Sequence, residues 1–141
     1  PPPPTLPQVP APVVSLSGVR PAQSAQIATI FFGIATAALT KDDVSVLREV
    51  SKLQLEIGGT IRVVGHSSRG APTVDRVKRG LLNFKLSLNR ANAVAAALTR
   101  LGVPKDHLEV IARGDGELLY AESSAAGVAG NRRAEIFLDF F

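Results

Sequence analysis

Residues 86–104 read LSLNRANAVAAALTRLGVP and predict an amphipathic helix. Ser87 suits the N-cap position, because its hydroxyl can accept an early backbone N–H. Gly102 follows the last apolar residue, and Pro104 does not continue a helix, so the helix is expected to end here. The apolar residues recur at three- and four-residue spacing, at Leu88, Ala91, Val94, Ala95, Leu98 and Leu101. This helix therefore has one face to bury.

Four β-branched or apolar runs around this helix predict strands, at residues 26–32, 60–66, 107–112 and 132–140. A second helix is predicted from Thr40 to Ile57, since Thr40 suits an N-cap and two glycines follow Ile57. Loops are expected between these elements, a basic one at 67–82 and a glycine-containing one at 113–130. The order βαβαββ predicts an α+β fold, a two-layer sandwich with the helices packed on one sheet.

The first 22 residues differ from the rest in composition. Seven of the ten prolines lie in residues 1–12, which favours extended polyproline II structure over a regular helix or strand. We interpret residues 1–22 as a spacer rather than a peptide ligand, and residues 23–141 as one folded domain. The apolar run at 27–39 is too short for a membrane span. Because the chain does not begin with Met, we expect a cut or processed fragment, in which any upstream signal peptide or anchor lies outside this sequence.

The composition argues against several classes of function. The chain has no Cys and two His, so disulfides, thiol nucleophiles and the usual zinc sites are not expected, and no cofactor is predicted. No acid/base pair or activated nucleophile indicates an enzyme. Few aromatic residues and no known motif argue against nucleic-acid binding. A net charge of +4 makes an anionic partner plausible.

Three polar clusters are candidates for a site. The first, Gly65-His66-Ser67-Ser68-Arg69, follows a predicted strand, where ligand crevices form in open sheets. A Ser–His nucleophile is disfavoured here, because no G-x-S-x-G motif is present and neighbours on a strand point to opposite faces.

The second cluster is the predicted helix start at Ser87 with Arg90 one turn later. Free N–H groups and a guanidinium suit a carboxylate or phosphate, although Arg90 lying on the surface or paired with Asp75 is an equal alternative. The third cluster is Asn131-Arg132-Arg133, in which adjacent arginines at a strand start point to opposite faces, so that one can reach the crevice.

Four stretches, in order, resemble the OmpA-like C-terminal domain: TIRVVGHSS, LSLNRANAVAAALTRLGVP, LEVIARGDGE and GNRRAEIFL. The resemblance covers residues 25–140. It implies a mixed four-stranded sheet and a non-catalytic module that binds peptidoglycan, as in outer-membrane protein A, peptidoglycan-associated lipoproteins and flagellar stator proteins. The implied location is the periplasm or cell envelope of a Gram-negative bacterium, in association with the outer membrane through a segment outside this chain.

The resemblance also implies which residues contact the stem peptide. Arg90 matches the arginine that clamps a carboxylate of diaminopimelate, and Ser68 stands where the family has an aspartate that holds its ammonium. The implied ligand-binding residues are Gly65, His66, Ser67, Ser68, Ser87, Arg90, Asn131 and Arg132. Because a hydroxyl carries no charge, Ser68 weakens this mode, and Asp75 is a possible substitute acid or a solvated loop residue. Two hypotheses remain: anchoring to peptidoglycan, or a degenerate domain that mediates protein assembly in the envelope.

Overall fold

The computed structural model describes residues 23–70 and 75–140, which form one sheet and three α-helices. The proline-rich spacer expected at 1–22 lies outside the described residues. The strands are β1 (Gln23–Phe31), β2 (Thr60–Gly65), β3 (Leu108–Ala112) and β4 (Arg133–Phe140). The helices are α1 (Lys41–Ile57), α2 (Arg76–Arg100) and α3 (Ala125–Asn131), with a 3₁₀ turn at Lys105–His107.

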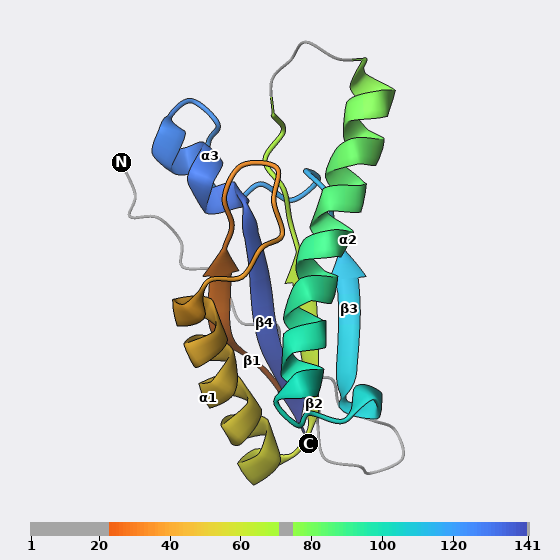
Figure 1. The fold of residues 1–141 in the computed structure, drawn as a ribbon. Helices are drawn as coiled ribbons and strands as arrows, with labels where there is room; N and C mark the ends of the chain where they lie inside the picture. The colour runs from red at the N-terminus through yellow and green to blue at the C-terminus, as the bar shows by residue number, and fades with distance from the viewer. Residues whose placement is uncertain (1–22, 71–74, 141) are drawn as a thin grey trace, which may run out of the picture.

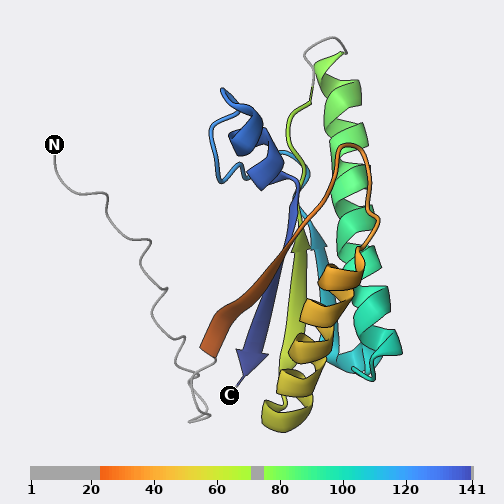
Figure 2. The ribbon, with the colours of Figure 1, turned by 60° about the vertical axis from the view of Figure 1, so that its left-hand side comes forward.

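The sheet has the strand order β1-β4-β2-β3 and is mixed. Strand β2 runs parallel to β3 and antiparallel to β4, which in turn pairs antiparallel with β1. Helices α1 and α2 cover the same face of the sheet, and α3 lies beyond the end at which β2 terminates (Figure 1, Figure 2). The predicted α+β class, with helices packed on one mixed four-stranded sheet, is confirmed.

The core lies between the sheet and the two long helices. Alternate residues of β2 and β4 face inward, so that Ile61 pairs with Leu138 and Val63 with Ile136 in one buried layer. The helices complete the core with Leu47, Val50, Val94 and Leu98, all almost fully buried. No helix in the described part of the chain is long and apolar enough to cross a membrane.

Helix α1 begins where the sequence predicts. The Thr40 hydroxyl accepts a hydrogen bond from Asp43 N at 3.1 Å, and the Asp43 carboxylate accepts one from Thr40 N at 2.9 Å. This reciprocal capping box satisfies two backbone donors at the start of the helix. The helix ends at Ile57, and Gly58 follows with a positive φ of 79°.

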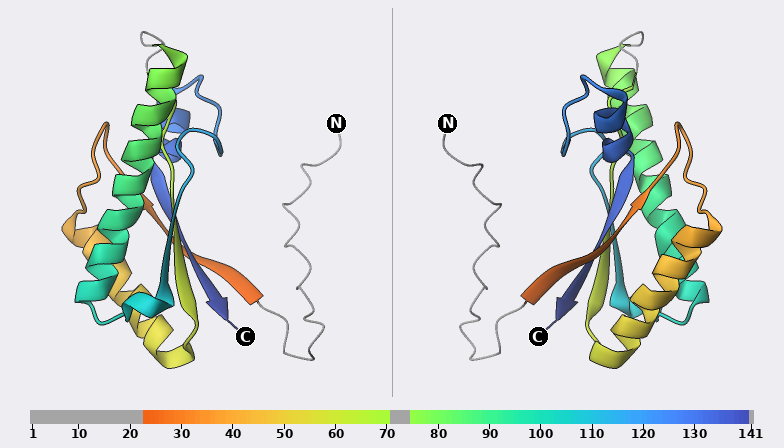
Figure 3. Two further views of the ribbon diagram at one scale, coloured as in Figure 1. Left: turned by 90° about the vertical axis from the view of Figure 1, so that its right-hand side faces the viewer. Right: turned by 90° about the vertical axis from the view of Figure 1, so that its left-hand side faces the viewer.

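Helix α2 begins well before the predicted start, because Asp75 and not Ser87 is its N-cap. The Asp75 carboxylate accepts hydrogen bonds from Val77 N and Lys78 N. Most residues that follow are good helix formers, and a single glycine, Gly80, costs only about 1 kcal/mol. Much of the loop expected at 67–82 is therefore helical, and α2 extends well past the end of the sheet (Figure 3).

Helix α3 lies within the segment expected to be a loop at 113–130. Its N-cap is Ser124, whose hydroxyl accepts a hydrogen bond from Gly127 N at 3.0 Å. The helix has only 7 residues, two of them glycines, so it shows no apolar periodicity in the sequence. The element order is consequently βαβαβαβ, with one helix more than predicted.

Candidate functional site

A cavity of about 550 Å³ lies at the end of the sheet where β2 terminates. Five segments line it: the β1–α1 loop, residues 68–70, α2, the β3–α3 loop, and the stretch from α3 into β4. Its charged lining residues are Arg69, Arg79, Arg90, Arg132 and Glu122. We call this cavity the arginine pocket. Four guanidinium groups against one carboxylate favour an anionic ligand.

Arg90 lines the arginine pocket, and its side chain is fully buried. Its Nε donates to Thr36 O, Nη1 to His66 O and Nη2 to Gly33 O, each at 3.0 Å. A guanidinium has five N–H donors, so two remain. Burial, with the nearby charge of Arg132, lowers the pKa of Arg90 to about 10, and the group stays cationic at neutral pH.

These contacts correct two expectations about Arg90. It lies far inside α2 rather than in the first turn, and it is neither a surface residue nor a partner of Asp75. Instead, it joins the β1–α1 loop to the end of β2. The side chain therefore has a structural role whatever the pocket binds.

Ser87 is a packing residue in the middle of α2 and not a cap. Its hydroxyl donates to Phe84 O at 2.7 Å and accepts from Gly114 N at 2.8 Å. Gly65 lies directly against it, since a Cβ on Gly65 would be 1.9 Å from Ser87 O. Neither residue lines the arginine pocket, and together they set the distance between β2 and α2.

His66 and Ser67 are buried and do not line the pocket. His66 Nε2 donates to Glu135 Oε1 at 2.6 Å, and Ser67 N donates to Gly114 O at 2.8 Å. The hydrogen bond from His66 is the main reason that the pKa of Glu135 lies below its ordinary value of 4.5, and the charge of Arg133 adds to it. His66 and Ser67 therefore support the pocket through these hydrogen bonds without lining it.

The lowered pKa of Glu135 predicts loss of stability in acid. The unfolded chain binds a proton at Glu135 at higher pH than the folded chain does, so the stabilisation is complete above about pH 4.5. This stabilisation is lost as the pH falls through the lower pKa that Glu135 has in the folded chain. Glu135→Gln should therefore flatten the decline in unfolding free energy between about pH 5 and pH 3, measured by urea titration. Parallel curves for the two proteins would contradict the assignment.

Arg132 and Arg133 diverge at the start of β4. Arg132 lines the arginine pocket, and its Nε donates to Phe32 O at 2.9 Å. Arg133 is buried, and its Nη2 donates to Glu117 O at 3.2 Å. Its Nε lies 3.4 Å from Glu135 Oε2, an ionic contact without hydrogen-bond geometry. Within the described residues, the Nη groups of Arg132 have no protein partner and are left for a ligand.

Asn131 is fully buried and holds the β3–α3 loop. Its Oδ1 accepts from Leu119 N and Tyr120 N, and its Nδ2 donates to Tyr120 O and Glu122 Oε2. It does not line the pocket. Asn131 therefore acts on the pocket only through the loop that it fixes.

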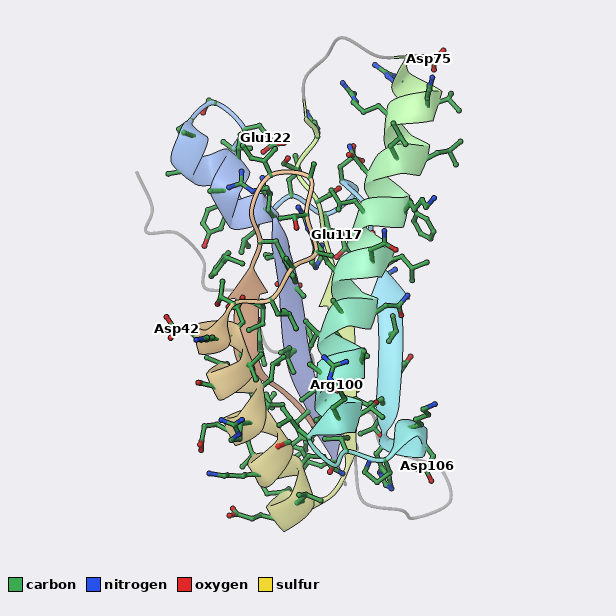
Figure 4. All side chains as sticks on the ribbon, viewed as in Figure 1. Asp42, Asp75, Arg100, Asp106, Glu117 and Glu122 are labelled. Atoms are coloured by element: carbon green, nitrogen blue, oxygen red, sulfur yellow. The ribbon has the colours of Figure 1, made fainter. Side chains whose placement is uncertain are left out.

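Of the residues predicted from the sequence, Ser68, Arg90 and Arg132 meet in the arginine pocket. Asp75 does not, because it caps the free end of α2, away from Glu122 (Figure 4). Glu122, half-buried in the β3–α3 loop, is a carboxylate in the pocket that the sequence did not reveal. It is the only acid between Glu117 and Glu135, but no spacing relates it to the other site residues.

The fold and the arginine pocket define a class of α+β domain with a cationic cavity at one end of a mixed sheet. A family model described as the OmpA family matches residues 31–132. The chain belongs to the OmpA family. No curated protein matches it.

Several solved structures have the same fold. The peptidoglycan-associated lipoprotein of Burkholderia pseudomallei is 21% identical, with a TM-score of 0.67, and the match covers 79% of this chain and 89% of that one. The C-terminal domain of MotB from Helicobacter pylori is 23% identical, with a TM-score of 0.68 and coverage of 79% and 85%. The cell wall anchor of the T6SS from Pseudomonas aeruginosa is 29% identical, with a TM-score of 0.65 and coverage of 78% of each chain.

Proposed function

We propose that this domain binds peptidoglycan noncovalently and anchors a cell-envelope protein or complex to the wall. The observation that carries the proposal is the arginine pocket, in which Arg132 presents its Nη groups near the buried cation of Arg90. Membership of the OmpA family supports it, as does the likeness to a cell wall anchor. The free carboxylates of a stem peptide are the anions that such a pocket would take.

Carboxylate recognition here depends on preorganisation. Three backbone carbonyls hold the Arg90 guanidinium, so little side-chain entropy is lost when a ligand binds. Arg132 is fixed at Nε and keeps the planar pair of Nη groups that suits a carboxylate. A partly enclosed cavity strengthens both attractions relative to open water. We propose no metal or cofactor for this task.

The proposed setting is the periplasm or cell envelope of a Gram-negative bacterium, in association with the outer membrane. Attachment to a membrane would come from a segment outside this chain. The proposed partner is the diaminopimelate-type stem peptide, with other envelope proteins as further partners. We propose neither catalysis nor nucleic-acid binding.

Arg132→Gln tests the proposal, because it removes a charge from the pocket at a residue that is only partly buried. We expect binding to isolated peptidoglycan sacculi to fall by about 10- to 100-fold in a sedimentation assay, the loss typical of one charge-assisted contact. Arg100→Gln, at the exposed end of α2, is the matched control and should bind like the parent. Binding by the parent should persist at high salt.

One observation favours a second candidate function. Ser68 lines the arginine pocket where the resemblance implies an aspartate. A neutral residue at this position favours a domain that has kept the fold, lost the wall ligand and mediates protein assembly. If the parent does not sediment with sacculi, or if salt removes its binding and that of Arg132→Gln alike, this second function replaces the first.

A further inference from the structure

We propose that Glu122 accepts the ammonium group of a zwitterionic ligand in the arginine pocket, a role that the neutral Ser68 cannot fill. The inference rests on the proposed function and adds a specificity-determining residue to it. Among the described residues that line the pocket, Glu122 is the only acid. A suitable ligand has separate carboxylate and ammonium groups, as in the head group of an amino acid. Its carboxylate would bind Arg132, and its ammonium would bind Glu122.

The position of the Glu122 carboxylate supports this role. Its Oε1 accepts a hydrogen bond from Arg69 N at 2.5 Å. Since Arg69 N is bonded directly to the carbonyl carbon of Ser68, the carboxylate lies beside the backbone of residue 68. The charge missing from the Ser68 side chain is thus present next to it, supplied by a residue from the β3–α3 loop.

The carboxylate is also held in place. Glu122 Oε2 accepts a hydrogen bond from Asn131 Nδ2 at 3.1 Å. Asn131 cannot turn its amide around, because its Oδ1 already accepts from Leu119 N and Tyr120 N. A side chain fixed at both oxygens loses little entropy when a ligand binds.

Glu122 keeps the capacity to bind a cation. A carboxylate accepts about four hydrogen bonds, and the two from Arg69 and Asn131 leave about two for an ammonium. The side chain is half-buried, so its charge is only partly screened by water. No guanidinium group forms an ion pair with it in the described part of the chain.

Glu122→Gln tests the inference with two ligands: a stem tripeptide that ends in diaminopimelate, and the same peptide with the side-chain amine acetylated. By isothermal titration calorimetry, we expect about 10- to 100-fold weaker binding of the free-amine peptide. Binding of the acetylated peptide should not change. Glu117→Gln is the matched control, because Glu117 lies in the same loop, contacts Arg113 and does not line the pocket.

A double variant separates charge from loop structure. Ser68→Asp in the Glu122→Gln background should restore tight binding of the free-amine peptide, because it returns a carboxylate to the same place. Unchanged binding in Glu122→Gln, equal weakening of both peptides, or no rescue by Ser68→Asp would each overturn the role of Glu122 while the pocket still binds peptidoglycan. If the parent binds neither peptide nor sacculi, the proposed function fails, and this inference fails with it.

Discussion

Arg90→Ala is expected to lower the free energy of unfolding by about 3–5 kcal/mol, a large part of the stability of a domain of this size. The guanidinium donates to three backbone carbonyls, of Gly33, Thr36 and His66. Removing it leaves these acceptors without their donor, and a cavity takes the place of a fully buried side chain. The change is measured by urea unfolding at neutral pH.

Arg100→Ala is the control, because Arg100 lies at the exposed end of the same helix and carries the same charge (Figure 4). It should change stability by less than about 0.5 kcal/mol. An equally small loss for Arg90→Ala would show that the three carbonyl contacts contribute nothing to stability. The expected result also has a practical consequence. Loss of wall binding in an Arg90 variant cannot be assigned to a ligand contact, so Arg132 is the better residue for testing the site.

Local signals in the sequence predict much of the fold. The start of α1 is readable because Thr40 and Asp43 cap each other across three residues. The start of α2 cannot be read in the same way. Ser87 is a residue type that often caps helices, but its hydroxyl accepts a hydrogen bond from Gly114 N, 27 residues away. Where a polar group finds its partner far along the chain, the local pattern points to the wrong role.

The candidate site follows the same rule. The family motif predicts that Arg90 and Arg132 belong to one site, and both line the arginine pocket. The motif does not reveal that Arg90 is buried and bonded to carbonyls 24 to 57 residues away. Asp75 is the acid nearest to Ser68 in the sequence, yet it caps the far end of α2. Glu122 reaches the pocket because Asn131 fixes its loop, and no periodicity or motif in the sequence encodes that contact.

Gly65→Ala is the second change for which we expect a large loss of stability, about 4 kcal/mol or more. A Cβ at this position would lie 1.9 Å from Ser87 O and 2.9 Å from Ser87 C, so the new methyl group meets backbone rather than a movable side chain. Strand β2 and helix α2 must move apart to admit it. That movement pulls on the 3.0 Å contact between Arg90 Nη1 and His66 O and on the bond from Gly114 N to Ser87.

Gly80→Ala provides a control of opposite sign. Gly80 lies inside α2, and a Cβ there would meet nothing within 4 Å. Since alanine favours a helix over glycine by about 1 kcal/mol, this variant should be slightly more stable than the parent in the same urea titration. If Gly65→Ala unfolds at the same urea concentration as the parent, β2 and α2 are not as closely packed as the contact at Ser87 requires. The arginine pocket would then lack the rigid base on which its preorganisation depends.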